Sequence, residues 1–161
     1  MRWFHVTMPE ARDPAFERRV RDSFARQAFM STLGASLLRV VPGEVHIALP
    51  FSPALTQQHG VLHAGVVTAV IDSACGYAAL TLMAPDADVM SVEFKVNLLR
   101  PAAGARFIAV GRVLRAGRTI TACQGELRAM QDDAEVVVAV LQGTMMTIRD
   151  RAAGADRVRE A

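Results

Sequence analysis

The longest apolar stretch of the chain runs from Val66 to Leu82 and follows a loop of polar and small residues at 57–65. Apolar side chains point in nearly every direction around a helix over this stretch, which predicts a helix that is buried on all sides. One carboxylate, Asp72, lies about two turns from its start. Because a buried charge is costly unless it is paired or faces a cavity, Asp72 is the first candidate for chemistry.

The sequence on both sides of this helix alternates in the manner of strands. In residues 89–99 the even positions from 90 to 98 are apolar and the odd positions 91–97 are polar, which predicts one apolar and one polar face. Turn residues follow at Ala116-Gly117 and Asp132-Asp133. A meander after a buried helix indicates an antiparallel sheet wrapped around that helix. The expected strands are 35–41, 45–49, 89–99, 107–115, 119–130 and 136–148.

An amphipathic helix is predicted near the N-terminus. Asp13-Pro14 has the form of a helix start, and apolar residues recur every four positions from Phe16 until the helix ends near Met30. Simple packing on the domain is the favoured role, and a lid over a pocket is the alternative. The expected organisation is an N-terminal helical segment at 1–32, one domain at 33–149 and a charged, flexible tail at 150–161.

Composition narrows the class of protein. With 161 residues, 52% of them hydrophobic and 21% charged, the chain suits one folded domain. A net charge of +2 gives no reason to expect a nucleic-acid partner, and polar residues within the central helix argue against a membrane segment. Cys75 and Cys123 have no C-x-x-C spacing, and the first residues do not have the form of a signal peptide, so a cytoplasmic location is expected.

The start of the central helix offers a site for a developing negative charge. Ala64 and Gly65 lie where the loop becomes helix, and the first amides of a helix have no partner within it. These amides and the helix dipole suit an oxyanion. Cys75 lies three residues past Asp72 without a histidine at helical spacing, which favours a buried core residue over a nucleophile. The histidines and cysteines show no metal-ligand spacing and no nucleotide-binding motif is present, so neither a metal nor a retained cofactor is expected.

Two blocks of sequence resemble a known family. His63-Ala64-Gly65, six further residues and Asp72 resemble the His-Gly-Gly-x6-Asp motif of PaaI-like hotdog-fold acyl-CoA thioesterases. The likeness extends to Gln57 and Gly60 upstream, to residues 91–104 downstream, and covers roughly 33–148. Gln57 replaces the family's usual asparagine and Ala64 its usual glycine. The resemblance implies an α+β hotdog fold, with an additional N-terminal helix here.

The resemblance also implies roles for individual residues. Asp72 would be the general base or the nucleophile, and the amide of Ala64 the main oxyanion donor. Gln57 would bind the water or the substrate carbonyl, and His63 would position the loop or contact the thioester. Ser91 would lie near the carboxylate, although strand alternation places it on the polar face. It would then reach the site across a subunit boundary or at a twisted strand start.

The family builds its site across a dimer interface. Asp72 and Ser91 of one chain would therefore face Gln57, His63 and Ala64 of the other, in a homodimer or a dimer of dimers. The expected activity is hydrolysis of acyl-CoA, with coenzyme A as part of the substrate and a lean toward fatty over aromatic acyl groups. The alternatives are a non-catalytic acyl-CoA-binding protein and a hotdog hydratase or dehydratase. The candidates for binding the phosphates of coenzyme A are Arg100, Arg115 and Arg118.

Overall fold

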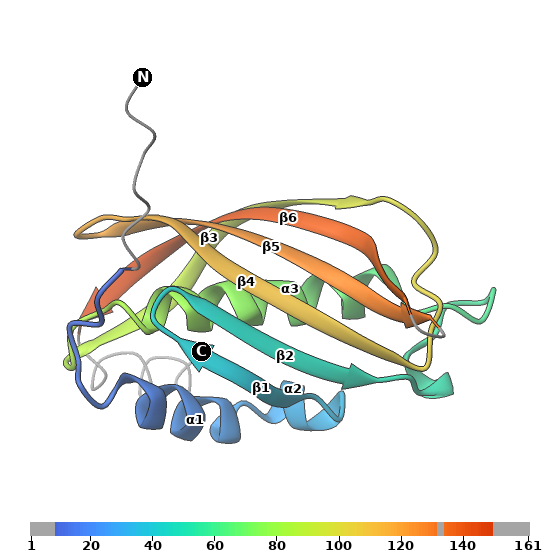
Figure 1. The fold of residues 1–161 in the computed structure, drawn as a ribbon, viewed down its shortest axis with the longest axis horizontal. Coiled ribbons are helices and arrows are strands. Elements are labelled where there is room, and N and C mark those ends of the chain that lie inside the picture. Colours follow the sequence, from blue (N-terminus) through green and yellow to red (C-terminus); the bar gives the residue numbers. More distant parts are fainter. Residues whose placement is uncertain (1–8, 132–133, 150–161) are drawn as a thin grey trace, which may run out of the picture.

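The fold is one curved antiparallel sheet that holds a long helix in its concave face. The computed structural model describes residues 9–131 and 134–149; the predicted turn at 132–133 and tail at 150–161 lie outside this part. The six strands lie in the order β1-β2-β4-β5-β6-β3 around α3 (Figure 1). This arrangement confirms the predicted hotdog architecture. The elements are α1 Phe16–Arg26, α2 Ala28–Thr32, β1 Ser36–Val41, β2 Glu44–Pro50, a short 3-10 helix Pro53–Leu55, α3 Ala64–Leu80, β3 Ala87–Leu98, β4 Arg106–Ala116, β5 Ile120–Gln131 and β6 Ala134–Arg149.

Two glycines allow α3 to lie close against the sheet. Gly111 on β4 and Gly125 on β5 pair directly with each other. A Cβ atom at Gly111 would lie 2.3 Å from the carbonyl carbon of Ala74, and one at Gly125 would lie 2.3 Å from a methyl carbon of Ile71. A side chain at Gly111 would meet the backbone of α3 and displace the helix, and one at Gly125 would force the side chains of Ile71 and Cys75 to move. The central helix is therefore buried as its all-round apolar sequence predicts.

The N-terminal segment forms two helices where the sequence predicted one. The helical path breaks at Gln27, whose backbone is extended (φ −80°, ψ 91°). The first helix also begins at Phe16, later than the Asp13-Pro14 start that was predicted, and Asp13 instead accepts a hydrogen bond from the amide of Ala15 at 2.8 Å. The break is a tertiary effect, because the Gln27 side chain bonds to residues of α3.

One side chain fastens α1 to the end of α3. The guanidinium of Arg19 donates hydrogen bonds to the carbonyl oxygens of three residues there, at 2.6–3.1 Å. Asp13 lies 3.3 Å from the same guanidinium. The cation meets the negative end of the helix dipole, which holds the N-terminal segment against the domain. The three carbonyl oxygens belong to Leu80, Met83 and Ala84.

Strand β3 lies at the edge of the sheet and carries a bulge. Its register with β6 shifts between Ser91 and Glu93, so that Val92 is an extra residue. The shift reverses the alternation of faces along the strand. The prediction of a single apolar face made by the even positions 90–98 is therefore wrong. The even positions before the bulge and those after it lie on opposite faces of the sheet. Several of these side chains are exposed, namely Met90, Val92, Phe94 and Leu98.

Candidate active site

The bulge brings Ser91 to the helix side of the sheet, where it meets Asp72. The Ser91 hydroxyl donates a hydrogen bond of 2.7 Å to Oδ1 of Asp72. Burial raises the pKa of the Asp72 carboxyl, and the Ser91 hydrogen bond partly opposes that rise. Of the two arrangements the sequence left open for Ser91, the structure shows contact within one chain near the start of the strand. The pair places a weakly basic oxygen at a defined position, as general base catalysis requires.

A groove of about 420 Å³ contains this carboxylate. Its walls come from α3, from the first part of β3 and from the C-terminal end of α1. Most of its lining side chains are polar, and Arg26 and Ser91 are exposed, so the groove is open to solvent. The lining residues are Ser23, Arg26, Gln27, Asp72, Ser73, Gly76, Tyr77, Asp88, Val89 and Ser91.

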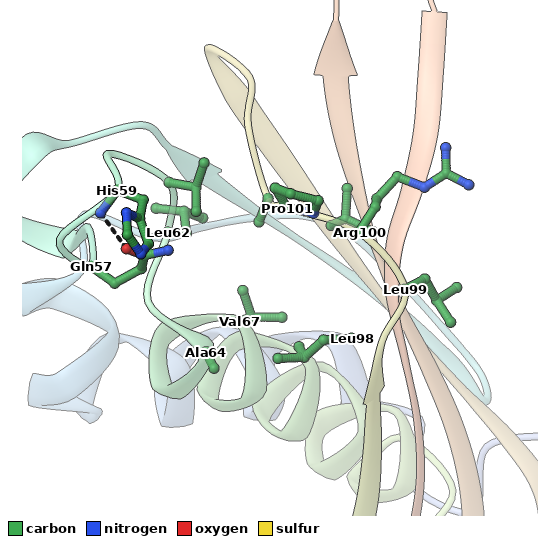
Figure 2. A pocket seen from close by; sticks show the side chains of 12 residues that line it. Gln57, His59, Leu62, Ala64, Val67, Leu98, Leu99, Arg100 and Pro101 are labelled. Atoms are coloured by element: carbon green, nitrogen blue, oxygen red, sulfur yellow. Dashed lines mark hydrogen bonds between the residues drawn. The ribbon is translucent and has the colours of Figure 1, made fainter.

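The loop before α3 is held by its own hydrogen bonds. The amide of Gln57 donates to the carbonyl oxygen of Val61 at 2.9 Å, and the amide of Gly60, at φ 78°, donates back to Gln57 at 3.0 Å. The side-chain oxygen of Gln57 accepts a hydrogen bond from the amide of His59 (Figure 2). That bond orients the Gln57 side chain and leaves the side-chain nitrogen, Nε2, as the group that can donate to a substrate.

His63 is the N-cap of α3. Its Nδ1 accepts a hydrogen bond of 2.9 Å from the amide of Gly65, and its carbonyl oxygen accepts from the amides of Val66 and Val67. His63 therefore caps the first turn of α3 and fixes the loop. The amide of Gly65, one of the two predicted oxyanion donors, is therefore already engaged.

The amide of Ala64 differs from those that follow it. Within the described part of the chain it has no hydrogen-bond acceptor, as expected for the first residue of a helix. Ala64 has helical backbone geometry, which alanine adopts without strain. The replacement of the family's glycine therefore keeps both the donor and the local conformation.

A second cavity, of about 610 Å³, opens beside this amide (Figure 2). It is mainly apolar, with Gln57 and His59 on one side and Arg100 on the other. The end of β3 and the turn that follows it form its outer wall. The lining residues are Gln57, His59, Val61, Leu62, Ala64, Val67, Leu98, Leu99, Arg100, Pro101, Ala102 and Val138.

The two halves of the candidate site lie far apart within one chain. Ala64 and Asp72 are eight residues apart on α3, which corresponds to about 12 Å along the helix axis. The two groups also open onto different cavities, Ala64 onto the larger one and Asp72 onto the polar groove. The predicted cations are also separated. Arg100 lines the cavity at the start of α3. Arg118, in the turn between β4 and β5, lines a small cavity at the other end of α3, and Arg115 lies at the end of β4 next to that turn.

Neither cysteine has the character of a nucleophile. Cys75 and Cys123 are fully buried, and the Cys123 thiol points at the carbonyl oxygen of Cys75 at 3.6 Å. Burial raises the pKa of both thiols, that of Cys123 to about 12. This confirms Cys75 as a core residue. Among the residues described, no cluster of three or more acidic, histidine or cysteine side chains could hold a metal ion, and no helix is long and apolar enough to cross a membrane.

Sequence reasoning missed the far wall of the Asp72 groove. Gly76 lies four residues after Asp72, so helical spacing was a signal that it shares the Asp72 side of α3. Ser73 and Tyr77, one and five residues after Asp72, lie to either side of that line and gave no clear signal. Gln27 gave no such signal, because it reaches the groove only through the packing of α1 on α3.

Comparisons with known proteins point to one family. Residues 59–136 match the model of the Thioesterase superfamily. A thioesterase family protein of Silicibacter pomeroyi is 48% identical and its crystal structure superposes with a TM-score of 0.83, over 84% of this chain and 99% of that one. A Saccharolobus solfataricus protein provisionally named an esterase is 33% identical over 97 residues, 60% of this chain and 68% of its own length. The Escherichia coli PaaI protein from the phenylacetic acid degradation operon shares the fold (TM-score 0.75, 17% identity, 83% and 93% covered).

Proposed function

The chain belongs to the Thioesterase superfamily of hotdog-fold proteins, and from that premise we propose that it hydrolyses acyl-CoA to a free acid and coenzyme A. Membership confirms the resemblance drawn from the residues around Asp72 and supports thioester hydrolysis as the general activity. The observation that carries the finer proposal is the Asp72 carboxylate, hydrogen-bonded by Ser91 and facing a groove large enough for an acyl group.

The reaction follows from the positions of these groups. Asp72 takes a proton from a water molecule, whose oxygen attacks the thioester carbonyl carbon. The amide of Ala64 stabilises the resulting oxyanion. The carbon–sulfur bond then breaks without needing a strong acid. The thiolate leaves as coenzyme A, and the proton held by Asp72 passes to it or to solvent, which regenerates the carboxylate. Direct attack by Asp72 is the alternative route, in which the carboxylate displaces the thiolate and forms a mixed anhydride. When water attacks the aspartyl carbon of that anhydride, a single turnover in isotopically labelled water places the label in the Asp72 carboxyl group.

The Ser91 hydroxyl sets the pH range of this base. Replacing Ser91 with alanine removes the hydrogen bond that lowers the pKa of Asp72, so we expect that pKa to rise further. Since the carboxylate is the active form, the acid limb of the pH profile of kcat/KM should move to higher pH. Ser91→Thr keeps a hydroxyl and is the matched control. An acid limb that stays in place in Ser91→Ala would show that Ser91 does not tune the base.

A homodimer would complete the site. Strand β3 is an edge strand with exposed apolar side chains, and such an edge favours pairing with another chain. Two β3 strands paired across a two-fold axis would bring the Asp72 groove of one chain toward the Ala64 cavity of its partner. The separation of about 12 Å along one α3 favours this pairing, because the two groups of one chain open onto different cavities. Two such dimers could associate further.

A heterodimer of two inactive chains tests the composite site. We expect a chain with Asp72→Asn paired with a chain carrying Ala64→Pro to recover about half of the wild-type activity, because one of its two sites keeps both groups. Co-expression with different affinity tags and sequential purification yields this heterodimer. The controls are the two homodimers, one in which both chains carry Asp72→Asn and one in which both chains carry Ala64→Pro. If the heterodimer is as inactive as they are, each site lies within one chain.

The three arginines that are candidates for binding coenzyme A also lie at two different ends of α3. Arg100 borders the cavity beside Ala64, so it is the candidate within that half-site for the phosphates of coenzyme A. Arg115 and Arg118 lie at the opposite end and would reach the same coenzyme A only from the partner subunit. The coenzyme A arm is therefore proposed to leave the thioester on the Ala64 side.

A thiol-release assay over a panel of acyl-CoA esters tests the proposed function. The panel should contain short, medium and long alkanoyl groups and aromatic acyl groups, since the family match does not select among them. Turnover of at least one ester, abolished in the homodimer of Asp72→Asn, is the expected result. Binding of the esters without release of coenzyme A would instead identify a non-catalytic acyl-CoA-binding protein.

A further inference from the structure

The groove beside Asp72 extends along α3 beyond the catalytic carboxylate. It passes Gly76, one turn further on, and reaches Tyr77, about 7.5 Å from Asp72 along the helix axis. A Cβ atom added at Gly76 would meet nothing within 4 Å. Glycine in the middle of a helix destabilises that helix. Gly76 lies where the floor of the groove is open, which gives the position a reason to lack a side chain.

Hydrogen-bonding groups close the far end of this groove. The Tyr77 hydroxyl donates to Oε1 of Gln27 at 3.0 Å, and Nε2 of Gln27 donates to the Ser73 hydroxyl at 3.4 Å. Ser73 and Tyr77 are buried, so both anchors are fixed. A glutamine amide has two N–H donors and two acceptor lone pairs, and these bonds use one of each. Within residues 9–131 and 134–149, Gln27 therefore retains one donor and one acceptor at the end of the groove.

Charges of both signs lie around the Tyr77 end of the groove. Burial raises the pKa of the Tyr77 hydroxyl; Asp88 raises it further, while Arg26 lowers it. Both charged residues line the groove, and Asp72 adds a second carboxylate. An anionic ligand would thus meet one cation and two acids. A neutral polar group meets no such repulsion and can bond to Gln27.

We propose that the groove beside Asp72 is the acyl subsite and that Gln27 selects acyl groups whose far end carries a neutral hydrogen-bonding group, such as a hydroxyl. This rests on the proposed hydrolysis of acyl-CoA. The other cavity, with Arg100 at its border, takes the coenzyme A arm, so the acyl group extends from the thioester in the opposite direction. A plain alkyl end would cover the donor and acceptor of Gln27 without satisfying them, which is unfavourable.

The substrate pair ω-hydroxyhexanoyl-CoA and hexanoyl-CoA tests this selection. The wild-type protein should have the higher kcat/KM for the hydroxylated ester. In Gln27→Leu, which keeps a similar volume without the amide, the preference should fall by about tenfold, the effect of one lost hydrogen bond. Gln124→Leu, on the exposed outer side of β5, is the matched control and should keep the wild-type preference. Thermal unfolding of each variant checks that the fold is retained.

A second substitution tests the path of the groove independently of Gln27. Gly76→Ala should fold at least as well as the wild type, because alanine favours a helix and its Cβ meets no atom. It should lower kcat/KM for ω-hydroxyhexanoyl-CoA more than kcat/KM for acetyl-CoA, and Gly76→Leu should enlarge this difference between the two esters.

Three results would overturn the inference. Equal wild-type rates for the two hexanoyl esters would remove the selection, and an unchanged preference in Gln27→Leu would remove Gln27 from it. A uniform loss across all esters in the Gly76 variants would show that the coenzyme A arm occupies the groove. Failure of the wild type to hydrolyse any acyl-CoA would instead contradict the proposed function, which keeps the two failures distinguishable.

Discussion

Replacing Asp72 with asparagine should lower kcat for acyl-CoA by about 10²–10⁴-fold while the fold is retained. Asparagine has nearly the same shape and can still accept the hydrogen bond from Ser91, so the groove should keep its geometry. It cannot take a proton from water at neutral pH, nor form an acyl intermediate. The measurement is thiol release under saturating substrate, with circular dichroism to establish that the variant is folded.

The stability of the same variant separates catalysis from structure. Burial raises the pKa of Asp72 in the folded state above its value in the unfolded chain. A raised carboxyl pKa means that folding favours the protonated form, so this contribution to stability is present below the unfolded pKa and lost as pH rises through the folded pKa. At neutral pH the charged carboxylate therefore opposes folding. Asp72→Asn should have an equal or higher Tm at neutral pH, and this gain should shrink at acid pH.

Cys75 provides the matched control for this experiment. It lies one turn from Asp72 on the same helix but is fully buried in the core. Cys75→Ala should therefore keep the catalytic rate of the wild type, with some loss of stability from the smaller side chain. Near-normal turnover by folded Asp72→Asn would exclude the carboxylate as base and nucleophile. Alkylation of wild-type Cys75 would then test the thiol.

The overall fold followed from local patterns that tertiary contacts did not override. The all-round apolar sequence after Ala64 gave a buried helix, and alternation gave six strands whose ends lie within two residues of the predicted positions. Both patterns depend on the period of side chains along a helix or a strand, which the sequence states directly. The motif from His63 to Asp72 located the candidate site in the same way, since its residues are close in sequence.

The differences arose where one residue changed the geometry. The bulge at Val92 reversed the faces of β3 and turned Ser91 toward Asp72, although the alternation in this segment has no visible interruption. The break at Gln27 followed from hydrogen bonds to Tyr77 and Ser73, which are distant in sequence. A single chain also cannot show how two copies meet, and the candidate site depends on that arrangement.

Replacing Ala64 with proline should lower kcat by about 10²–10³-fold, the usual effect of losing one oxyanion-hole donor. Proline lacks the N–H group, and Ala64 is the first residue of α3, the helical position that best tolerates proline. The preceding residue, His63, has φ −63° and ψ 139°, the extended geometry that a following proline requires. The helix and its cap should therefore form as before, with only the donor removed.

The comparison with Ala64→Gly makes this substitution decisive. Glycine keeps the N–H group, and it is the residue that the PaaI-like motif normally has at this position. We expect Ala64→Gly to retain wild-type kcat within a few-fold, whereas Ala64→Pro loses kcat with little change in KM, because an oxyanion donor acts mainly in the transition state. Thermal unfolding and kinetics of both variants provide the measurement. If folded Ala64→Pro turns over at the wild-type rate, the oxyanion is stabilised elsewhere; if it loses affinity and kcat together with Tm, the substitution has only disturbed the loop.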